Sequence, residues 1–387
     1  MTADFATLLD RERLVDRLQQ LVRTPSENPP GEEAAAAALT SAFCADLGLD
    51  VEEHEAEPGR PSVVARWRGS HGPTLCYCSH IDVVPSGDPG LWERDPFSGA
   101  IDGGRLHGRG SSDAKGPVAA ALEAVAILRA AGWGPQGTLE LALVADEETM
   151  GFKGAGYLVE QKVLAPDVAI VGEPTSLRVV RAQRGASWFR LTTRGVAGHG
   201  SAPERGVNAI KHMAEIVLHL EDTLPDVSHP LLGGPTISVG TIRGGEKVNI
   251  IPAACIAEID RRTIPGETKE SVVEGIEEAV ERARKRFADV DARLDLAFFA
   301  EPFEVSAGAR VVTAAVEAIH ATTGRDVDVI GFRGASDARF LFEAGAHVIL
   351  CGPGDITLAH TARESIDLAE LEHGAIAYAR AFASLLS

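Results

Sequence analysis

Short apolar runs that end in histidine or acidic residues recur along this chain. The runs Leu75–Cys78, Leu139–Ala145, Val168–Val171 and Val348–Cys351 have the length of strands, and helical patterns such as Lys115–Ala131 lie between them. This alternation predicts a mostly parallel sheet covered by helices. In such a sheet, ligands gather outside the carboxyl ends of the strands. We therefore expect the residues that follow these runs to meet at one edge of the sheet.

The residues that follow the runs are of the types that bind divalent metal ions. Imidazole nitrogens and carboxylate oxygens are typical zinc ligands. A further acid follows the Gly-rich stretch 107–112, just before a helical pattern. If the runs are neighbouring strands, two histidines and several carboxylates converge in one pocket. The residues concerned are His80, Asp82, Asp113, Glu147, Glu148, Glu173 and His360.

Each of these residues also has an ordinary structural explanation. Asp113 is suited to be the N-cap of the helix that follows it. The acids 146–148 could form an acidic turn, although three adjacent negative charges call for a positive group, which a metal would supply. Glu173 could end its strand before Pro174, and a single loop histidine such as His360 is commonly just solvated. Their joint placement at strand ends favours a metal site.

Two other kinds of site compete for the same segments. Cys76 and Cys78 share the strand parity of His80, so a thiolate site Cys-x-Cys-x-His is an alternative, although free cysteines inside an apolar run are usually buried. The glycines in 108–112 resemble a dinucleotide-binding loop but lack the full Gly-x-Gly-x-x-Gly spacing. A nucleotide-dependent oxidoreductase is therefore disfavoured.

Length, charge and cysteine content limit the class of protein. The 387 residues suffice for two domains, and the net charge of −19 argues against nucleic acid or an anionic membrane as a partner. No apolar stretch reaches the ~20 residues of a membrane span, and Met1–Arg13 contain no apolar signal core. The five cysteines do not make a disulfide framework. We expect a soluble cytoplasmic protein.

The pattern of elements changes twice along the chain. Between about residues 183 and 301 the expected order is strand, helix, strand, strand, helix, strand, which is the ferredoxin-like signature. The alternating α/β pattern returns after Pro302. We predict an α/β catalytic domain, with a mostly parallel sheet sandwiched by helices, that an α+β lid and dimerisation domain interrupts. The expected segments are 1–182, 183–301 and 302–387.

Six short motifs resemble the signatures of the co-catalytic di-zinc metallopeptidases. That family includes aminoacylases, acetylornithine deacetylases, succinyl-diaminopimelate desuccinylases and glutamate carboxypeptidases. The resemblance runs from about residue 10 to the end of the chain and implies a zinc-peptidase-like fold. The motifs are Cys78–Pro85, Gly108–Gly116, Asp146-Glu147-Glu148, Gly172-Glu173-Pro174-Thr175, Gly198–Pro203 and Ala359-His360-Thr361.

The resemblance implies a role for each metal-site residue. Asp113 would bridge two zinc ions, for which cobalt or manganese could substitute. His80 and Glu173 would complete the site of one ion, and Glu148 and His360 that of the other. The hydroxide shared by the two ions would attack an amide carbonyl.

Catalytic and substrate-binding roles follow from the same resemblance. Glu147 would be the general base, and Asp82 would orient His80. In dimeric members of the family, a histidine that matches His199 reaches across the dimer to the tetrahedral oxyanion, so we expect a homodimer. We also expect a hinge near residues 182 and 301. The substrate-binding candidates are Asn249, Arg262, Arg184 and the Gly334 loop.

The resemblance implies an N-acyl-amino-acid amidohydrolase. The segment Cys351–Ile356 with Ala359-His360 is nearer to the acetylornithine deacetylase pattern, whereas Gly334-Ala335-Ser336-Asp337 departs from the Gly-Thr-Ser-Asp of the desuccinylases. The alternatives on the same site are a metallo-carboxypeptidase or dipeptidase and a succinyl-diaminopimelate desuccinylase. A metal-free relative that kept the fold is a further alternative. We expect the substrate to be an N-acyl amino acid or a dipeptide.

Overall fold

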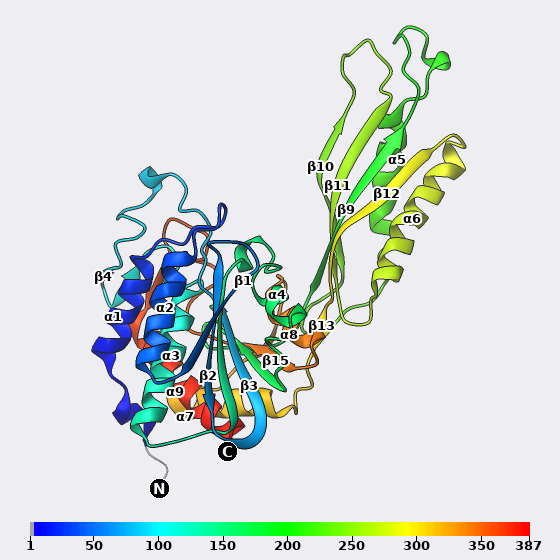
Figure 1. Cartoon of the computed structure of the whole chain (residues 1–387). Coiled ribbons are helices and arrows are strands. Elements are labelled where there is room, and N and C mark those ends of the chain that lie inside the picture. The colour runs from blue at the N-terminus through cyan, green and yellow to red at the C-terminus, as the bar shows by residue number, and fades with distance from the viewer. Residues whose placement is uncertain (1–3) are drawn as a thin grey trace. The chain divides into compact units, whose positions relative to one another are not determined.

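The computed structural model describes residues 4–387, and the chain divides into two compact units (Figure 1). Unit 1 comprises the described residues up to Arg181 together with Val305–Ile330 and Ser336–Ser387. Unit 2 comprises Ala182–Glu304 and Gly331–Ala335. Each unit has its own layers and its own buried residues, and each is described by itself.

Unit 1 contains most of a mixed sheet whose central strands are parallel, as the sequence predicts; β13 and the last residues of β8 and β14 in that sheet belong to unit 2. The strand order is β1-β2-β6-β3-β7-β15-β8-β13, and β14 also pairs with β8. The pairs β6·β3, β3·β7 and β7·β15 are parallel, whereas the outer pairs β1·β2, β2·β6, β15·β8 and β8·β13 are antiparallel. The strands are β1 (Asp50–Glu55), β2 (Pro61–Arg68), β3 (Ser70–His80), β6 (Gln136–Val144), β7 (Val168–Val171), β8 (Val179–Gln183), β13 (Phe303–Glu304), β14 (Val329–Phe332) and β15 (His347–Leu350).

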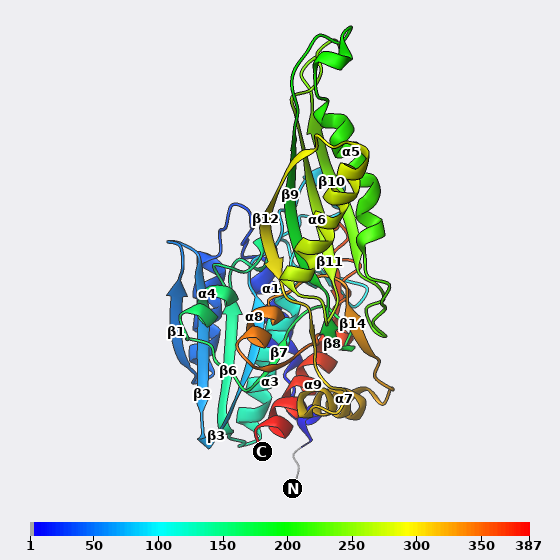
Figure 2. The same ribbon diagram turned by 90° about the vertical axis from the view of Figure 1, so that its right-hand side faces the viewer.

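Helices cover both faces of this sheet. Figure 1 shows α1, α2 and α3 on one side of the strands and α4 and α8 on the other. Figure 2 shows β1, β2 and β6 side by side, as the strand order requires. α3 packs against α1 and α9, and α9 packs against α7. The helices are α1 (Arg11–Val22), α2 (Ala34–Asp46), α3 (Lys115–Ala130), α4 (Ala155–Glu160), α7 (Arg310–Thr323), α8 (Ala338–Glu343) and α9 (Leu368–Leu385).

The sequence of α3 explains why it forms the central helix of this layer. Alanine loses no side-chain entropy in a helix, and the small side chains let α3 lie buried over almost its whole length. The helix ends before Gly132, whose φ of 67° is left-handed, and the Gly132 N–H donates to the Arg129 carbonyl over 3.0 Å. The helix starts two residues after Asp113, so the rigid α3 limits the position of the segment that carries Asp113.

A small antiparallel sheet of order β16-β5-β4 brings two distant segments of unit 1 together. β5 (Arg105–His107) pairs with β4 (Ala100–Asp102) and with β16 (Ser365–Asp367). The segment that carries Asp113 follows β5, and the segment that carries His360 precedes β16. The pairing therefore places these two segments next to each other.

Unit 2 contains a four-stranded antiparallel sheet and two helices. The chain order is β9-α5-β10-β11-α6-β12 and the sheet order is β10-β11-β9-β12, which is the expected ferredoxin-like arrangement. In β9, Phe189 and Leu191 are buried whereas Trp188 and Arg190 are exposed. The elements are β9 (Gly185–Arg194), α5 (Ala209–Leu220), β10 (Thr236–Gly244), β11 (Ala254–Thr263), α6 (Lys269–Arg286) and β12 (Asp291–Ala300).

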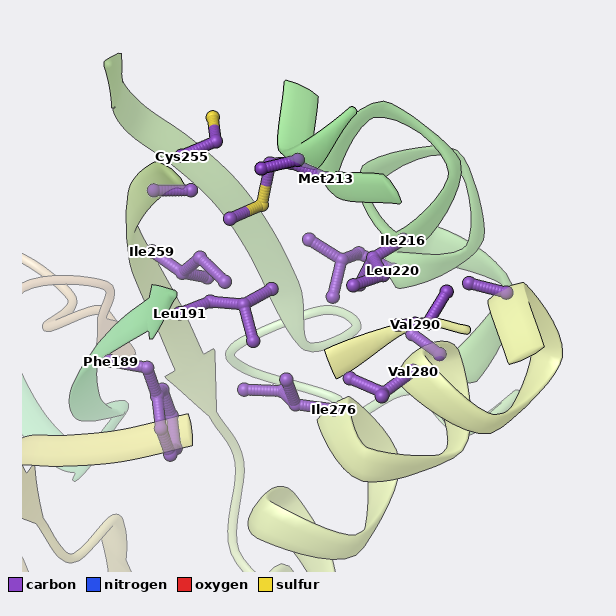
Figure 3. Packing of buried hydrophobic residues seen from close by; sticks show 14 of the residues in the cluster. Phe189, Leu191, Met213, Ile216, Leu220, Cys255, Ile259, Ile276, Val280 and Val290 are labelled. Carbon is purple, nitrogen blue, oxygen red and sulfur yellow. The ribbon is translucent and has the colours of Figure 1, made fainter. Parts of the chain in front are cut away.

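The core of unit 2 lies between this sheet and its two helices (Figure 3). Leu191 and Ile259 point from the strands toward Met213 and Ile216 of α5 and Ile276 of α6. These side chains are nearly inaccessible to solvent. The residues of this apolar core all belong to unit 2.

The boundaries of unit 2 differ from the predicted 183–301 in three places, the first being its start at Ala182. Phe303 and Glu304 belong to unit 2, because they pair with Gln183 and Ala182. Residues 331–335, which we expected in the last catalytic segment, also belong to unit 2. Gly331 packs so closely that a Cβ there would lie 2.6 Å from the Leu231 carbonyl oxygen.

Candidate metal centre

The parallel strands of unit 1 end at a common edge, and the candidate ligands follow them there. His80, the last residue of β3, pairs with Val144 at the end of β6. Val171, the last residue of β7, pairs with Cys78 of β3 and with Leu350 of β15. Glu147, Glu148 and Glu173 come within four residues of these strand ends, and His360 lies in the loop after β15. The sheet therefore gathers segments that are far apart in the chain.

Four of these side chains lie within contact distance of one another. His80 Nε2 is 3.1 Å from Asp113 Oδ1. His360 Nε2 is 3.4 Å from Asp113 Oδ2 and 3.1 Å from Glu148 Oε2. His80, Asp113 and Glu148 each offer one ligand atom, and these three atoms lie within 4.8 Å of one another. Nitrogen and oxygen donors at this spacing suit a divalent cation.

Buried carboxylates crowd the cluster. Burial raises the pKa of Glu173 to about 8 and the pKa of Glu147 well above its usual range, and neighbouring carboxylates add to both shifts. Burial also raises the pKa of Glu148, against its hydrogen bond with His360. Oε1 of Glu173 is buried without a hydrogen-bond partner among residues 4–387. A cation would satisfy that oxygen and offset the crowded negative charge, so these residues fit a metal.

The contacts of the two histidines with Asp113 shift the pKa values of all three groups. Burial acts to lower the pKa of His80, but hydrogen bonds with Asp113 and Asp82 outweigh it and the pKa lies well above its usual value. Hydrogen bonds with Asp113 and Glu148 raise the pKa of His360 to about 10. Burial acts to raise the pKa of Asp113, yet the two histidines hold it below its usual value. Since an imidazole binds metal in its neutral form, metal binding here would release protons.

Asp82 orients its neighbours differently from the expectation. His80 Nδ1 is 2.9 Å from the main-chain oxygen of Asp82 and 3.6 Å from its carboxylate. The carboxylate accepts hydrogen bonds from the N–H groups of Glu147 and Glu148, over 3.3 and 3.2 Å, and from Asn28 Nδ2 over 2.8 Å. The main chain of Asp82 thus sets the ring of His80, while its side chain holds the loop that carries both glutamates.

The first of the three adjacent acids has a protein cation beside it. Asp146 Oδ1 lies 2.9 Å from the buried guanidinium of Arg60, which also pairs with the buried carboxylate of Glu33. Asp146 accepts further hydrogen bonds from the Thr149 hydroxyl and the Lys153 N–H. The expectation that a metal offsets all three acids is therefore wrong for Asp146, because Arg60 does so.

Of the alternatives drawn from the sequence, one is wrong and another is disfavoured. Asp113 is not the N-cap of α3: Ala114 holds that position and makes no side-chain cap, while the Asp113 carboxylate contacts His80 and His360. Cys76 and Cys78 are fully buried, and burial raises the pKa of both thiols well above the usual value, which disfavours a thiolate site.

Three buried charged residues lie beside the centre, and of these the sequence analysis named only Asp337, as part of the Gly334 loop. Glu364 accepts a hydrogen bond from the Asp113 N–H over 3.1 Å. Arg339 donates to the carbonyl of Met150, in the loop of Glu148. Asp337 is buried, and neither of its carboxylate oxygens has a hydrogen-bond partner in the described part of the chain; burial raises its pKa to about 7. The only signal for them in the sequence is a charge among small or apolar neighbours.

The candidate oxyanion donor and two substrate-binding candidates lie in unit 2. His199 is exposed, and its Nδ1 accepts a hydrogen bond from the Ser201 N–H over 3.1 Å. That bond assigns the hydrogen to Nε2, which makes Nε2 a donor. Gly200 donates to the carbonyl of Asn249 over 2.9 Å, which places His199 and Asn249 on adjoining segments. Arg262 forms a two-point ion pair with Asp260, at 2.7 and 2.9 Å.

The other two candidates in unit 2, Arg184 and Gly334, make close contacts within the protein. The guanidinium of Arg184 is buried and donates to the carbonyls of Leu232 and Gly234, which explains its position without a ligand. The expected substrate role of Arg184 stays a prediction. Gly334 packs against the ring of Phe332, which a Cβ would approach to 2.8 Å.

The sequence profile described as peptidase family M20/M25/M40 matches residues 76–384. The chain belongs to this family. It is accordingly a hydrolase of amide bonds from a metal-dependent peptidase family whose substrates are acyl amino acids or peptides. None of the helices within residues 4–387 is long and apolar enough to cross a membrane.

Relatives of known activity resemble the chain over nearly its whole length. Acetylornithine deacetylase of Aliivibrio fischeri (strain MJ11) is 31% identical over 363 residues, which cover 89% of this chain and 91% of the relative. Succinyl-diaminopimelate desuccinylase of Marinobacter nauticus is 29% identical over 377 residues, covering 95% and 97%. Among solved structures, aminopeptidase PepT from Bacillus cereus has a TM-score of 0.82 at 22% identity, covering 98% and 100%. That structural likeness supports the fold.

Proposed function

We propose that the chain hydrolyses the amide bond of an N-acyl amino acid, in the manner of an acetylornithine deacetylase, with two zinc ions. The observation that carries the proposal is the contact of His80, Asp113, Glu148 and His360 at one sheet edge. Asp113 would hold both ions, since its two carboxylate oxygens face different histidines. His80 and Glu173 would complete one set of ligands, and Glu148 and His360 the other. Cobalt or manganese could substitute for zinc.

The bound ions would supply Lewis acidity, which activates water and polarises the substrate carbonyl. The protein supplies the movement of protons. Glu147 is the candidate general base: burial and the nearby Glu173 raise its pKa, so its carboxylate takes up a proton more readily than that of a solvated glutamate. The same carboxyl group can then give that proton to the departing nitrogen. Asp82 holds the main chain of Glu147 and so limits where the carboxylate can lie.

Neutralising Glu147 tests its role directly. We expect Glu147→Gln to lower kcat by about 10²- to 10⁴-fold, the usual contribution of a general base, while metal content stays at the wild-type level. Glu160→Gln, a change of an exposed glutamate in α4, is the matched control and should leave kcat unchanged. Full activity of the Glu147→Gln protein would remove Glu147 from the mechanism.

The acyl group decides between the proposed function and its alternatives on the same site. Two curated relatives act as their names state, on acetylornithine and on succinyl-diaminopimelate. Among the structural relatives is a metallo-carboxypeptidase of Sulfolobus solfataricus, with a TM-score of 0.78. A panel of N-acetyl amino acids, N-succinyl-diaminopimelate and dipeptides, tested on metal-loaded protein, separates these activities. Faster turnover of dipeptides than of any N-acyl amino acid would favour the peptidase.

His199 motivates the proposal of a homodimer. Its Nε2–H is available as a donor to a developing oxyanion. Loss of such a donor typically lowers kcat by about 10²- to 10³-fold. If the histidine acts across a dimer, activity per chain should fall on dilution below the dissociation constant. Analytical ultracentrifugation together with kcat of His199→Ala tests this. A monomer with full activity at every concentration, or an unchanged kcat, would contradict it.

A further inference from the structure

Glu364 connects the segment of Asp113 with the segment of His360. It lies four residues after His360 and is almost fully buried, with 1% of its surface exposed. Its Oε1 accepts hydrogen bonds from two consecutive main-chain N–H groups, those of Ser112 and Asp113, each over 3.1 Å. A single carboxylate oxygen thus fixes the main chain from which the Asp113 side chain projects.

The second carboxylate oxygen of Glu364 also accepts a hydrogen bond from the protein. Oε2 accepts a hydrogen bond of 2.5 Å from Nη1 of the buried Arg109. The same guanidinium donates to the Thr361 carbonyl over 3.4 Å and lies over the ring of Trp92, with 5.2 Å to its centroid. The Gly108 N–H donates to the main-chain oxygen of Glu364 over 3.1 Å. Five hydrogen bonds therefore join segments that are about 250 residues apart in sequence.

Positioning of this kind matters because the two segments hold different ligands. The Asp113 carboxylate lies between His80 and His360, so a shift of the Asp113 segment changes both histidine–carboxylate distances and a shift of the His360 segment changes one. Groups that orient metal ligands from behind typically contribute 10- to 100-fold to metal affinity. Without such groups, metal binding would have to order two separate loops. The conformational entropy lost in ordering them would weaken metal binding.

We propose that Glu364 is a positioning residue that preorganises Asp113 and His360 for the metal ions. The inference rests on the proposed function, because it takes Asp113 and His360 as ligands. It assigns Glu364 no contact with metal or substrate, since both of its carboxylate oxygens are already used by protein donors. Its effect should therefore show in metal affinity before it shows in chemistry.

The same unit offers a closely matched control, Glu123. This glutamate is also fully buried, accepts a hydrogen bond from a main-chain N–H, that of Asp10, over 3.0 Å, and pairs with Arg13 and Arg17. It lies in α3, away from any candidate ligand in sequence. Glu123→Gln and Glu364→Gln thus remove the same kind of buried, arginine-paired carboxylate, and only the second should disturb the metal ligands.

The experiment is a competition titration of the full-length apoprotein with zinc against a chromophoric chelator, combined with the zinc-induced shift in Tm. We expect Glu364→Gln to bind zinc 10- to 100-fold more weakly than wild type and to show a smaller zinc-induced rise in Tm. Glu123→Gln should lower the Tm of the apoprotein yet keep wild-type zinc affinity. Glu364→Asp keeps the charge on a shorter side chain and should fall between wild type and Glu364→Gln.

The outcomes separate the two proposals. If wild type binds no zinc, the proposed function fails. If wild type binds zinc and Glu364→Gln binds it equally well, the role of Glu364 is refuted while the proposed function stands. An equal loss of affinity in Glu123→Gln would make the effect a general loss of stability and would also refute it. Should Glu364→Gln not fold, Glu364→Asp decides, and wild-type affinity in that protein counts against the proposal.

Discussion

At the scale of single residues, the three adjacent acids of the metallopeptidase motif have three different surroundings. Asp146 is paired with Arg60 and two other donors. Glu147 and Glu148 have their main chain held by Asp82. Glu148 also contacts His360, whereas Glu147 has its pKa raised by burial and by Glu173. Adjacent residues of one chemical type thus acquire separate tasks from the groups packed against each.

Arg60 should be essential for the stability of unit 1. Its guanidinium compensates two buried carboxylates, Glu33 and Asp146. Replacing it by methionine leaves both charges buried without their cation, which we expect to cost about 3–5 kcal/mol of unfolding free energy. The control is Arg68→Met, which breaks an exposed pair with Asp50 and should cost at most about 1 kcal/mol. Denaturant unfolding followed by circular dichroism measures both, and equal losses in the two variants would contradict this account.

The sequence indicated the candidate ligands but not the residues that hold them in place. His80, Glu148 and Glu173 could be found because each follows a strand-length apolar run, and parallel strands end at one edge. Glu364 and Arg60 could not, because nothing local distinguishes a charge that compensates a buried partner from one that is solvated. Their partners lie at long range, as for Glu364 and Asp113, so only the folded chain identifies them.

At the scale of elements, the loop that carries the glutamates is shaped by left-handed backbone. Asp146 and Met150 have φ values of 72° and 88°, and Gly151 has 65°. Arg339 donates to the Met150 carbonyl from the start of α8. Gly151 packs on Asp337, where an added Cβ would lie 1.9 Å from Oδ1. The turn 336–339 thus fixes the far end of the Glu147–Glu148 loop.

Gly151→Ala should displace this loop, and Gly132→Ala provides the comparison. Both glycines have nearly the same left-handed φ, at 65° and 67°, but a Cβ at Gly132 would meet nothing within 4 Å. Gly132→Ala should therefore lower the free energy of unfolding only by the cost of a left-handed backbone conformation in alanine, about 1–2 kcal/mol. Gly151→Ala should cost more and also lower kcat, by roughly 100-fold if the Glu147 carboxylate shifts by about 1 Å. Thermal unfolding and kinetics test the pair, and wild-type kcat in Gly151→Ala would refute the displacement.

Long elements were predictable and short polar ones were not. The expected helix Lys115–Ala131 ends within one residue of the observed α3, because its alanines and buried face agree along the whole segment. β1, by contrast, has the sequence DVEEHE and is largely exposed at the sheet edge, so it lacks an apolar alternation to recognise. β8 begins shortly after Ser176 and Leu177, two residues with positive φ. No local sequence pattern predicted that conformation.

At the scale of the whole molecule, the candidate metal site lies within one of the two units. The candidate ligands all belong to unit 1, whereas unit 2 has an apolar core of its own around Leu191 and Ile259. The change of pattern near residue 183 indicated this division in the sequence. The assignment of 331–335 to unit 2 could not be read there, because it depends on packing of Gly331 against Leu231.

Removing metal should therefore destabilise unit 1 selectively. A ligand that binds only the folded state adds about 2.7 kcal/mol at 100 times its dissociation constant, and chelation removes that contribution where the ligands lie. We expect hydrogen exchange to accelerate in β3 and α3 after treatment with a chelator, and to stay unchanged in β9 and β11. Leu191→Ala gives the converse case: loss of a fully buried leucine costs about 2–5 kcal/mol. It should speed exchange in unit 2 while leaving zinc affinity unaltered. Faster exchange in both units on chelation would show that the metal stabilises the chain as one cooperative body.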